Sequence, residues 1–175
     1  MTWMTHPRLL APAALLALAG CDMGARPRAA ATPAPAMATI AVSVGPCFGF
    51  CPVYSVAVTP GGTITFNGER HTAVLGQKLR EGGPAAYRAL SAALAPYRPA
   101  TGTVAETPCD QTVSDQARYH ITWTAPDGTV TALDHDRGCR TAAGQALNAA
   151  LLAMPDQLGI EPWARQTNRP GASRG

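Results

Sequence analysis

Two stretches of this sequence share one pattern, YSVAVTPGGTITF at residues 54–66 and YHITWTAPDGTVT at residues 119–131. In each stretch, apolar and polar residues alternate, a turn containing proline and glycine follows, and a second alternating segment comes after the turn. The second copy carries one extra residue, Ala125, before its turn. The pattern predicts two antiparallel β-hairpins of similar construction.

Each predicted hairpin leads to a similar segment with helical periodicity. The sequence ALSAAL at residues 89–94 matches ALNAAL at residues 146–151. Four residues mark the expected ends of the two helices: Pro84 and Thr141 at the starts, Pro96 and Pro155 at the finishes. Because the helices match as well as the hairpins, we favour an internal duplication over a chance likeness between two hairpins.

Two further segments extend the predicted sheet. Residues 39–44 alternate in polarity and predict a leading strand, and residues 71–76 predict an additional strand in the first unit. The predicted fold class is therefore α+β. It consists of two similar ββ(β)α units that form an antiparallel sheet with two helices packed on one face.

The N-terminus has the features of a bacterial lipoprotein signal peptide. A basic start leads into an apolar run at residues 9–19, which is shorter than the roughly 20 residues that a membrane-spanning helix needs. The sequence Leu18-Ala19-Gly20-Cys21 then places a cysteine at the cleavage site, so Cys21 is the predicted lipidation site. The alternative is an ordinary secretory signal with a chance cysteine. We expect a lipid-anchored, periplasm-facing protein of the cell envelope, at the inner or the outer membrane.

Composition divides the chain into four parts. We expect a signal peptide at residues 1–20, an Ala/Pro-rich tether at residues 21–38, a folded domain at residues 39–163 and a disordered tail at residues 164–175. The formal net charge is +3, but its basic excess lies in the two tails. A nucleic-acid-binding domain would concentrate positive charge on its folded surface. The charge distribution therefore argues against a nucleic-acid partner.

The remaining cysteines predict two disulfides. With Cys21 assigned to lipid, four cysteines remain, which is typical of a disulfide-stabilised exported domain. Three connectivities are possible for four cysteines. We favour Cys47–Cys51 and Cys109–Cys139, because the short spacing of the first pair already brings its two residues close together.

The first cysteine pair also admits a redox or metal role. The spacing Cys47-x-x-x-Cys51-Pro52 resembles the copper-binding motif of Sco-type assembly proteins, in which two thiolates and a distant histidine hold copper. In that family the motif opens a helix of a thioredoxin fold, whereas residues 53–58 here have the pattern of a strand. We therefore favour a structural disulfide.

The segment around this motif is similar to a known family. The sequence GPCFGFCPVYSVAV at residues 45–58, followed by GGTITFNG at residues 61–68, resembles DUF6438, a bacterial domain of unknown function often found in exported or lipid-anchored proteins. The similarity is strongest over residues 40–75 and extends more loosely to about residue 160. The resemblance implies a shared fold and brings no activity with it.

The polar stretch DHDRGC at residues 134–139 is the remaining candidate for chemistry. We interpret it as an exposed connection between the last strand and the last helix. Zinc ligation or general-base catalysis by His135 is the alternative. His71 and His120 are expected to be solvent-facing strand residues. No recognised catalytic motif occurs in the sequence, so we assign no catalytic residue, no metal ligand and no cofactor.

These features favour a non-enzymatic binding or envelope-associated module. The expected partners are the membrane, through the lipid anchor, and envelope proteins or cell-wall components. The leading alternative is a thiol–disulfide or copper-handling protein that uses Cys47 and Cys51. A further alternative is a hydrolase built around His135.

Overall fold

The computed structural model describes residues 37–167. The predicted signal peptide, the lipidation site Cys21, all but the last two residues of the predicted tether, and residues 168–175 of the predicted tail lie outside the described residues.

Within the described range, seven strands form one sheet in the order β4-β3-β2-β1-β6-β7-β5. Neighbouring strands are antiparallel, except that β5 runs parallel to β7. The strands are β1 (Thr39–Val44), β2 (Val53–Val58), β3 (Thr63–Arg70), β4 (Gly76–Glu81), β5 (Val104–Glu106), β6 (Arg118–Thr124) and β7 (Val130–Asp136). The predicted hairpins are β2–β3 and β6–β7, and they flank β1 on its two sides.

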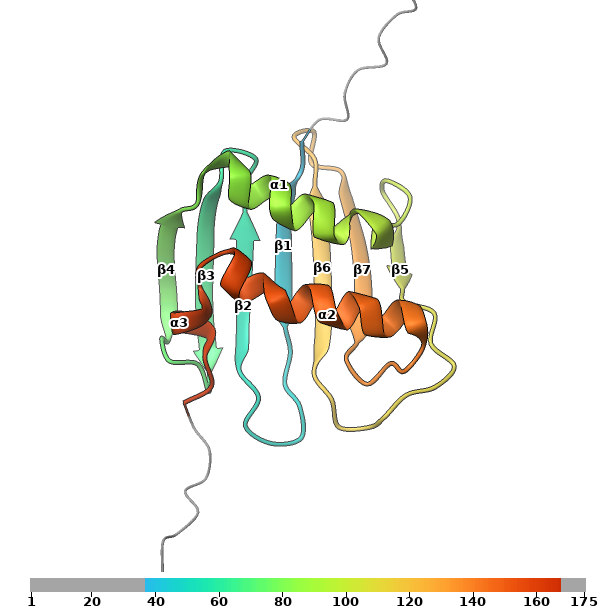
Figure 1. Ribbon diagram of the computed structural model, residues 1–175. Helices are drawn as coiled ribbons and strands as arrows, with labels where there is room; N and C mark the ends of the chain where they lie inside the picture. The colour runs from blue at the N-terminus through green and yellow to red at the C-terminus, as the bar shows by residue number, and fades with distance from the viewer. Residues whose placement is uncertain (1–36, 168–175) are drawn as a thin grey trace, which may run out of the picture. The chain divides into compact units, whose positions relative to one another are not determined.

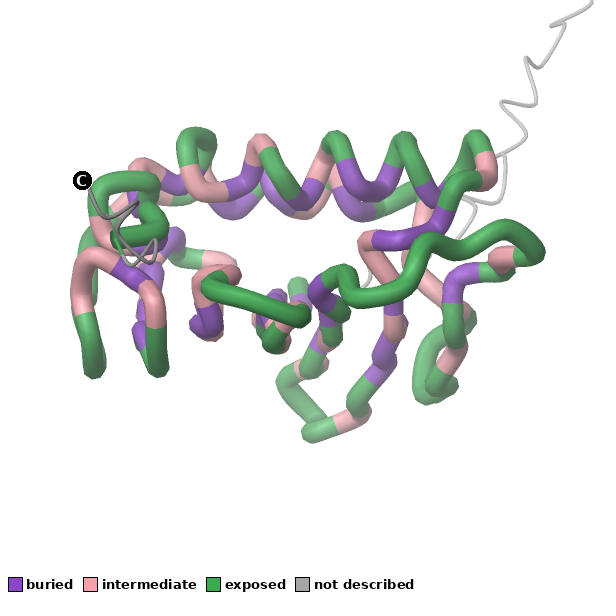
Figure 2. Tube along the Cα trace, turned by 90° about the horizontal axis from the view of Figure 1, so that it is seen from below, coloured by how far each residue is buried: buried purple, intermediate pink, exposed green. Residues whose placement is uncertain are grey.

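Two long helices lie across the strands on one face of the sheet (Figure 1, Figure 2). The helices are α1 (Gly83–Leu94), α2 (Ala142–Gln157) and the single turn α3 (Glu161–Ala164). Helix α1 continues into the short 3-10 helix η1 (Ala95–Tyr97). The α+β class and the packing of both helices on one face are confirmed. Across residues 37–167, no helix has both the length and the apolar character needed to span a membrane.

The core lies between the helices and this face of the sheet. Apolar side chains alternate along the central strands and point at the helices, and α1 and α2 each contribute one apolar stripe. Fully buried examples from sheet and helices are Ile40, Val42, Phe66, Ile121, Leu90 and Leu151. The opposite face carries small and polar side chains, and we call it the open face.

The starts of α1 and α2 agree with the positions predicted from the sequence, whereas the end of α2 does not. Pro84 lies in the first turn of α1, and the Thr141 hydroxyl accepts a hydrogen bond from the Gly144 backbone N–H at 3.2 Å. Helix α1 ends at Leu94, next to Pro96, as expected. The expected end of the second helix at Pro155 is wrong, because α2 runs on to Gln157. A proline in a last turn removes only one backbone hydrogen bond, so the helix can continue past it.

Both edge strands differ from the sequence prediction. The expected strand at residues 71–76 is wrong, because β4 begins only at Gly76 and His71 adopts a positive φ of 59° in the connection before it. Strand β5 was not predicted at all. Every residue of β4 is exposed, and β5 is three residues long, so neither strand shows the polarity alternation that reveals a half-buried strand.

Two disulfides, Cys47–Cys51 and Cys109–Cys139, close loops of very different length. The pairing agrees with the connectivity favoured from the sequence. Cys47–Cys51 closes the connection between β1 and β2, with a sequence separation of 4. Cys109–Cys139 joins the connection after β5 to the connection that leads into α2, with a sequence separation of 30.

Removal of the longer disulfide should destabilise the domain more than removal of the shorter one. From loop length alone, the chain-entropy argument gives about 3.7 kcal/mol for Cys109–Cys139 and about 2 kcal/mol for Cys47–Cys51. Urea unfolding of the double variants Cys109→Ala/Cys139→Ala and Cys47→Ala/Cys51→Ala, each with the other disulfide intact, measures both losses. Equal losses, or the larger loss for the short loop, would contradict this expectation.

Candidate functional site

The Cys47–Cys51 loop lies at the end of β1. Its tip presents Phe48, which is 88 % exposed. The Phe48 N–H donates to the Asp115 carbonyl at 3.2 Å, which ties the loop to the connection before β6. Phe50 contacts His71 edge-on, with ring centroids 5.2 Å apart. The disulfide and this backbone hydrogen bond thus hold the loop that presents the exposed Phe48 side chain beside the sheet.

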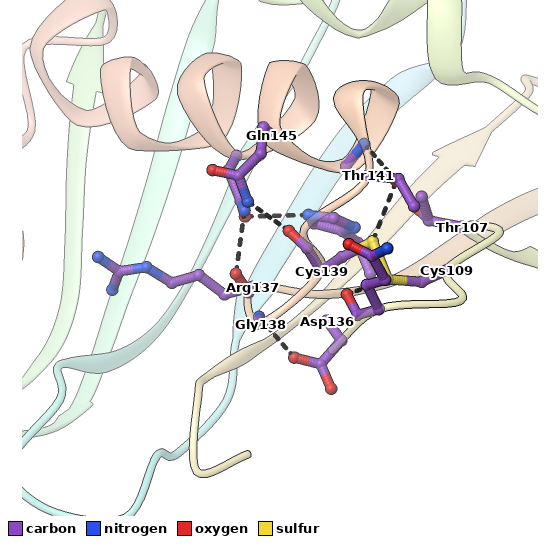
Figure 3. The surroundings of a disulfide bond; sticks show 12 residues. Thr107, Cys109, Asp136, Arg137, Gly138, Cys139, Thr141 and Gln145 are labelled. Atoms are coloured by element: carbon purple, nitrogen blue, oxygen red, sulfur yellow. Dashed lines mark hydrogen bonds between the residues drawn. A yellow bond between two sulfur atoms is a disulfide. The ribbon is translucent and has the colours of Figure 1, made fainter. Parts of the chain in front are cut away.

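The Cys109–Cys139 disulfide anchors the start of α2 (Figure 3). The Cys139 sulfur lies 3.3 Å from the Thr141 hydroxyl, and the Gln145 side-chain amide donates to the Cys139 carbonyl. A Cβ on Gly144 would lie 2.5 Å from the Cys139 sulfur, so only glycine fits at this point of the helix. These contacts fix the connection between β7 and α2.

Two tyrosines flank the last residue of β1. Val44 pairs with Tyr54 of β2 on one side and with Tyr119 of β6 on the other. They stand at matching positions in the two repeated segments, and both side chains are more than nine-tenths buried. Adjacent strands lie about 4.8 Å apart, so the two tyrosine Cα atoms are roughly 10 Å apart.

The two tyrosines line a cavity of about 240 Å³ between the ends of the central strands and the C-terminal end of α2. We call it the tyrosine cavity. Its apolar walls include Val44, Leu152 and Ala164. Its charged residues are Arg137, Arg165, Asp156 and Glu161, and Cys51 also borders it.

Burial controls the protonation of both phenols. Burial raises the pKa of Tyr54, and the nearby Tyr119 raises it further. Burial also raises the pKa of Tyr119, and the positive charge of Arg137 opposes part of that rise. Both phenols therefore stay protonated at neutral pH and can donate hydrogen bonds into the cavity.

Arg137 enters the cavity from the connection after β7, and its backbone is held at two points. Its N–H donates to the Ala117 carbonyl at 3.0 Å, and its carbonyl accepts from the Asn148 side-chain amide at 2.9 Å. The guanidinium extends away from the Cys109–Cys139 disulfide (Figure 3). Among the described residues, no hydrogen bond or ion pair reaches that guanidinium.

His135 does not lie in an exposed connection. The interpretation of residues 134–139 as such a connection is wrong for residues 134–136. Asp134, His135 and Asp136 end strand β7, and the alternation of the strand turns His135 toward the helices, where it is 0 % exposed. Its Nε2 lies 3.0 Å from the Asn148 Oδ1, which can only accept, so Nε2 carries the proton. Its Nδ1 is buried and has no partner among the described residues.

The burial of His135 argues against zinc ligation and against general-base catalysis by this residue. Its ring stacks on Tyr119, with centroids 6.2 Å apart, and no substrate can reach it in this position. Across residues 37–167, no group of three or more His, Cys, Asp or Glu side chains is arranged to hold a metal ion.

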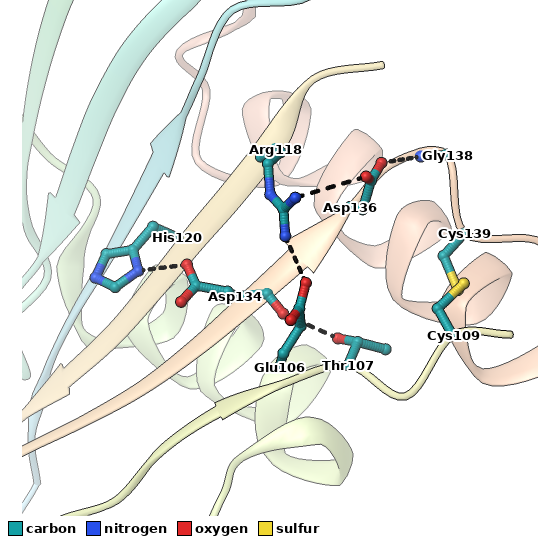
Figure 4. Close-up of polar contacts among 9 residues, drawn as sticks. All are labelled: Glu106, Thr107, Cys109, Arg118, His120, Asp134, Asp136, Gly138 and Cys139. Atoms are coloured by element: carbon teal, nitrogen blue, oxygen red, sulfur yellow. Dashed lines mark hydrogen bonds and ion pairs between the residues drawn. A yellow bond between two sulfur atoms is a disulfide. The ribbon is translucent and has the colours of Figure 1, made fainter. Parts of the chain in front are cut away.

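The open face carries a charged row near its β5 edge (Figure 4). His120 Nδ1 lies 2.8 Å from the Asp134 carboxylate, and both side chains are nearly half exposed. Arg118 pairs with Glu106 and, at 3.9 Å, with Asp136. Exposed ion pairs of this kind contribute about 0–1 kcal/mol each to stability. His120 faces solvent from a strand, as expected, whereas His71 lies in a connection and not on a strand.

Ser43 lies directly opposite His120 on β1, which brings a serine, a histidine and an aspartate into one row of the sheet. A nucleophilic serine needs a hydrogen bond to its histidine and donors for the oxyanion. Within the described part of the chain, no hydrogen bond joins Ser43 to His120. The row therefore lacks the contact on which catalysis of this type depends.

Sequence reasoning did not identify the tyrosine cavity. In the sequence, Tyr54 and Tyr119 are the first residues of the two repeated segments, and Arg137 is part of the polar stretch at residues 134–139. The available signal was the repeat itself, since it places both tyrosines at the same position of the two hairpins. Arg137 offered no comparable signal.

His135 should make stability depend on pH. Burial lowers its pKa, while Asn148 and Asp136 oppose the decrease. Below the ordinary histidine pKa of about 6.5, the unfolded chain takes up a proton that the folded chain refuses, so stability falls as pH decreases. The loss should not exceed about 1.4 kcal/mol per pH unit.

Chemical denaturation at pH 8, 7, 6 and 5 measures this dependence, and His135→Gln is the control because glutamine can still donate to Asn148. The variant should lose less stability than the wild type between pH 6.5 and 5. Identical losses in the two proteins would show that other groups cause the pH dependence.

Comparison with protein families gives one match. The family described as Domain of unknown function (DUF6438) matches residues 38–155, which is more than half of the chain. The matched range contains all seven strands, both disulfides, and the residues Tyr54, Tyr119 and Arg137. Comparisons with curated proteins and with solved structures gave no match. The chain therefore belongs to the DUF6438 family.

Proposed function

We propose that this protein is a lipid-anchored envelope protein whose disulfide-stabilised domain acts as a non-enzymatic binding module. The lipobox at Leu18-Ala19-Gly20-Cys21 supports the anchor. Two disulfides in a small domain fit an oxidising compartment outside the cytoplasm.

The position of the tyrosine cavity is the observation that supports a binding role best. β1 begins at Thr39, two residues after Met37, the first described residue, and ends at Val44 on the opposite side of the sheet (Figure 1). Val44 lines the cavity. Six residues of a strand span about 20 Å. A tether that joins the domain at Met37 would therefore attach at the end of β1 that lies away from the cavity and the Phe48 loop.

Substitution of Cys21 by serine should abolish lipidation. The variant should accumulate as the unprocessed precursor, because processing of a lipobox requires the cysteine thiol. Metabolic labelling with a fatty acid and mass determination of the purified protein measure the two effects. If Cys21→Ser is still cut to the wild-type mature length, the protein is an ordinary secreted protein.

Binding itself is tested with the native lipidated protein. It is used to recover envelope components, which are then identified by mass spectrometry. A binding module should retain a reproducible set of components that the Tyr54→Phe/Tyr119→Phe double variant recovers in reduced amount. Equal recovery by both proteins would remove the cavity from the proposed function.

One observation favours a second candidate, a thiol–disulfide or copper-handling protein. Cys51 borders the same cavity as Arg137 and Arg165, although these arginines are remote from it in sequence. A nearby cation lowers the pKa of a thiol and makes its thiolate more reactive. The exposed Phe48 and the strand that follows the motif provide no such stabilisation, so we still favour a structural disulfide.

The reduction potential of Cys47–Cys51 separates the two candidates. We expect a value below about −300 mV, which is typical of structural disulfides. A glutathione redox titration with Cys109 and Cys139 intact measures it, and Cu(I) competition on the reduced protein follows. A potential above about −250 mV, or one-to-one copper binding that requires both cysteines, would favour the second candidate.

A further inference from the structure

Two tyrosine hydroxyls belong to the lining of the tyrosine cavity, in addition to its charged side chains and Gln166. Tyr54 and Tyr119 are 6 % and 4 % exposed, and neither hydroxyl hydrogen-bonds to any residue that the structure describes. Neither hydroxyl oxygen is among the fully buried atoms without a partner in the described residues, so both hydroxyls are accessible from the cavity that the tyrosines line. Both phenols are protonated at neutral pH, so each can donate a hydrogen bond to an acceptor on a ligand.

Arg137 adds a positive charge next to these two donors. Its influence on the pKa of Tyr119 reflects how close the guanidinium lies to that phenol. A guanidinium presents a planar pair of N–H donors that matches the two oxygens of a carboxylate. Asn148 and Ala117 hold the Arg137 backbone beside the cavity that this residue lines, so only its side chain has to be ordered when a ligand binds.

The remaining walls restrict the size and charge of the ligand. The volume of about 240 Å³ is smaller than the roughly 300 Å³ at which sites for whole small molecules begin, so it fits the end of a longer ligand. Val44, Leu152 and Ala164 provide apolar contact for a small side chain. Asp156, Glu161 and Arg165 are exposed charged residues of the lining. The two carboxylates would repel a doubly charged phosphate more strongly than a singly charged carboxylate.

We propose that the tyrosine cavity binds the terminal carboxylate of a short peptide whose last residue has a small apolar side chain. The Arg137 guanidinium and the hydroxyls of Tyr54 and Tyr119 donate to the carboxylate. The terminal side chain packs on the apolar walls, and backbone N–H groups of the peptide face Asp156 and Glu161. This proposal rests on the binding role proposed above and names the class of its ligand.

Two sources could supply such a terminus in the envelope. Protein C-termini end in L-residues, whereas cell-wall peptides carry D-residues. The shared chemistry is a carboxylate next to a small apolar side chain, and the handedness of the probe separates the sources. N-acetyl-L-Ala-L-Ala and N-acetyl-D-Ala-D-Ala therefore serve as probes, each also as its C-terminal amide.

Isothermal titration calorimetry of the full-length protein with both disulfides intact tests the proposal. At least one free acid should bind saturably, and its amide should bind at least about tenfold more weakly, because the amide loses a charged hydrogen-bond acceptor. Inorganic phosphate should bind more weakly than the free acid. Tighter binding of the L-peptide or of the D-peptide identifies the source, and both outcomes support the carboxylate site.

Matched variants locate the binding. Arg137→Gln should weaken binding of the free acid by about tenfold or more, and Arg137→Lys should restore part of it. Tyr119→Phe keeps the buried ring and removes only the hydroxyl, so it remains informative if Arg137→Gln unfolds. Arg118→Gln removes a guanidinium from the open face and should leave the affinity unchanged.

Several outcomes would overturn the proposal. These are the absence of saturable binding by either free acid at millimolar concentration, equal affinity for acid and amide, tighter binding of phosphate, or wild-type affinity in both Arg137→Gln and Tyr119→Phe. If the native protein still recovers envelope components that depend on Tyr54 and Tyr119 while neither acid binds, the ligand class is wrong and the binding function stands. If the native protein recovers no such components and neither free acid binds, both proposals fail.

Discussion

The double pairing of β1 is the constraint on which the rest of this domain depends. β1 lies between the two hairpins and is hydrogen-bonded to β2 on one side and to β6 on the other. Val42, for example, pairs with Val56 and with Ile121, which occupy the same position of the repeat. Because side chains alternate with a period of two, a slip of one residue would turn the core side chains of β1 to solvent. The register of one strand therefore aligns both halves of the domain.

The same register creates the candidate site. At the last residue of β1 the equivalent partners are Tyr54 and Tyr119, so the two copies of the repeat contribute one phenol each to a single cavity. Arg137, one of the two arginines that line it, has no counterpart in the first copy and comes from the connection into α2. That connection is held by the buried pair His135–Asn148 and by the Cys109–Cys139 disulfide. The residues that stabilise the end of β7 thus also hold the Arg137 backbone beside the cavity.

The two faces of the sheet have separate roles. The helix-covered face holds the apolar core and the cavity at its end, whereas the open face carries exposed ion pairs such as Arg118–Glu106. The exposed pairs add little to stability because water solvates their charges. His120 and His135 come from adjacent strands, yet one is solvated and the other is fully buried. The difference follows from which face of the sheet each side chain points to.

The sequence by itself determined the features that local patterns encode. The hairpins β2–β3 and β6–β7, the helices, the α+β class and the close pair Cys47–Cys51 all follow from periodicity or spacing within short segments. Only the tertiary structure decided the edge strands β4 and β5, which lack a buried face, and the burial of His135 at the end of β7. It also decided the cavity, because Tyr54, Tyr119 and Arg137 are far apart in the chain and meet only through the pairing of β1 with both hairpins. Alternation and helical periodicity report which side of an element is buried, whereas a binding site depends on which elements become neighbours.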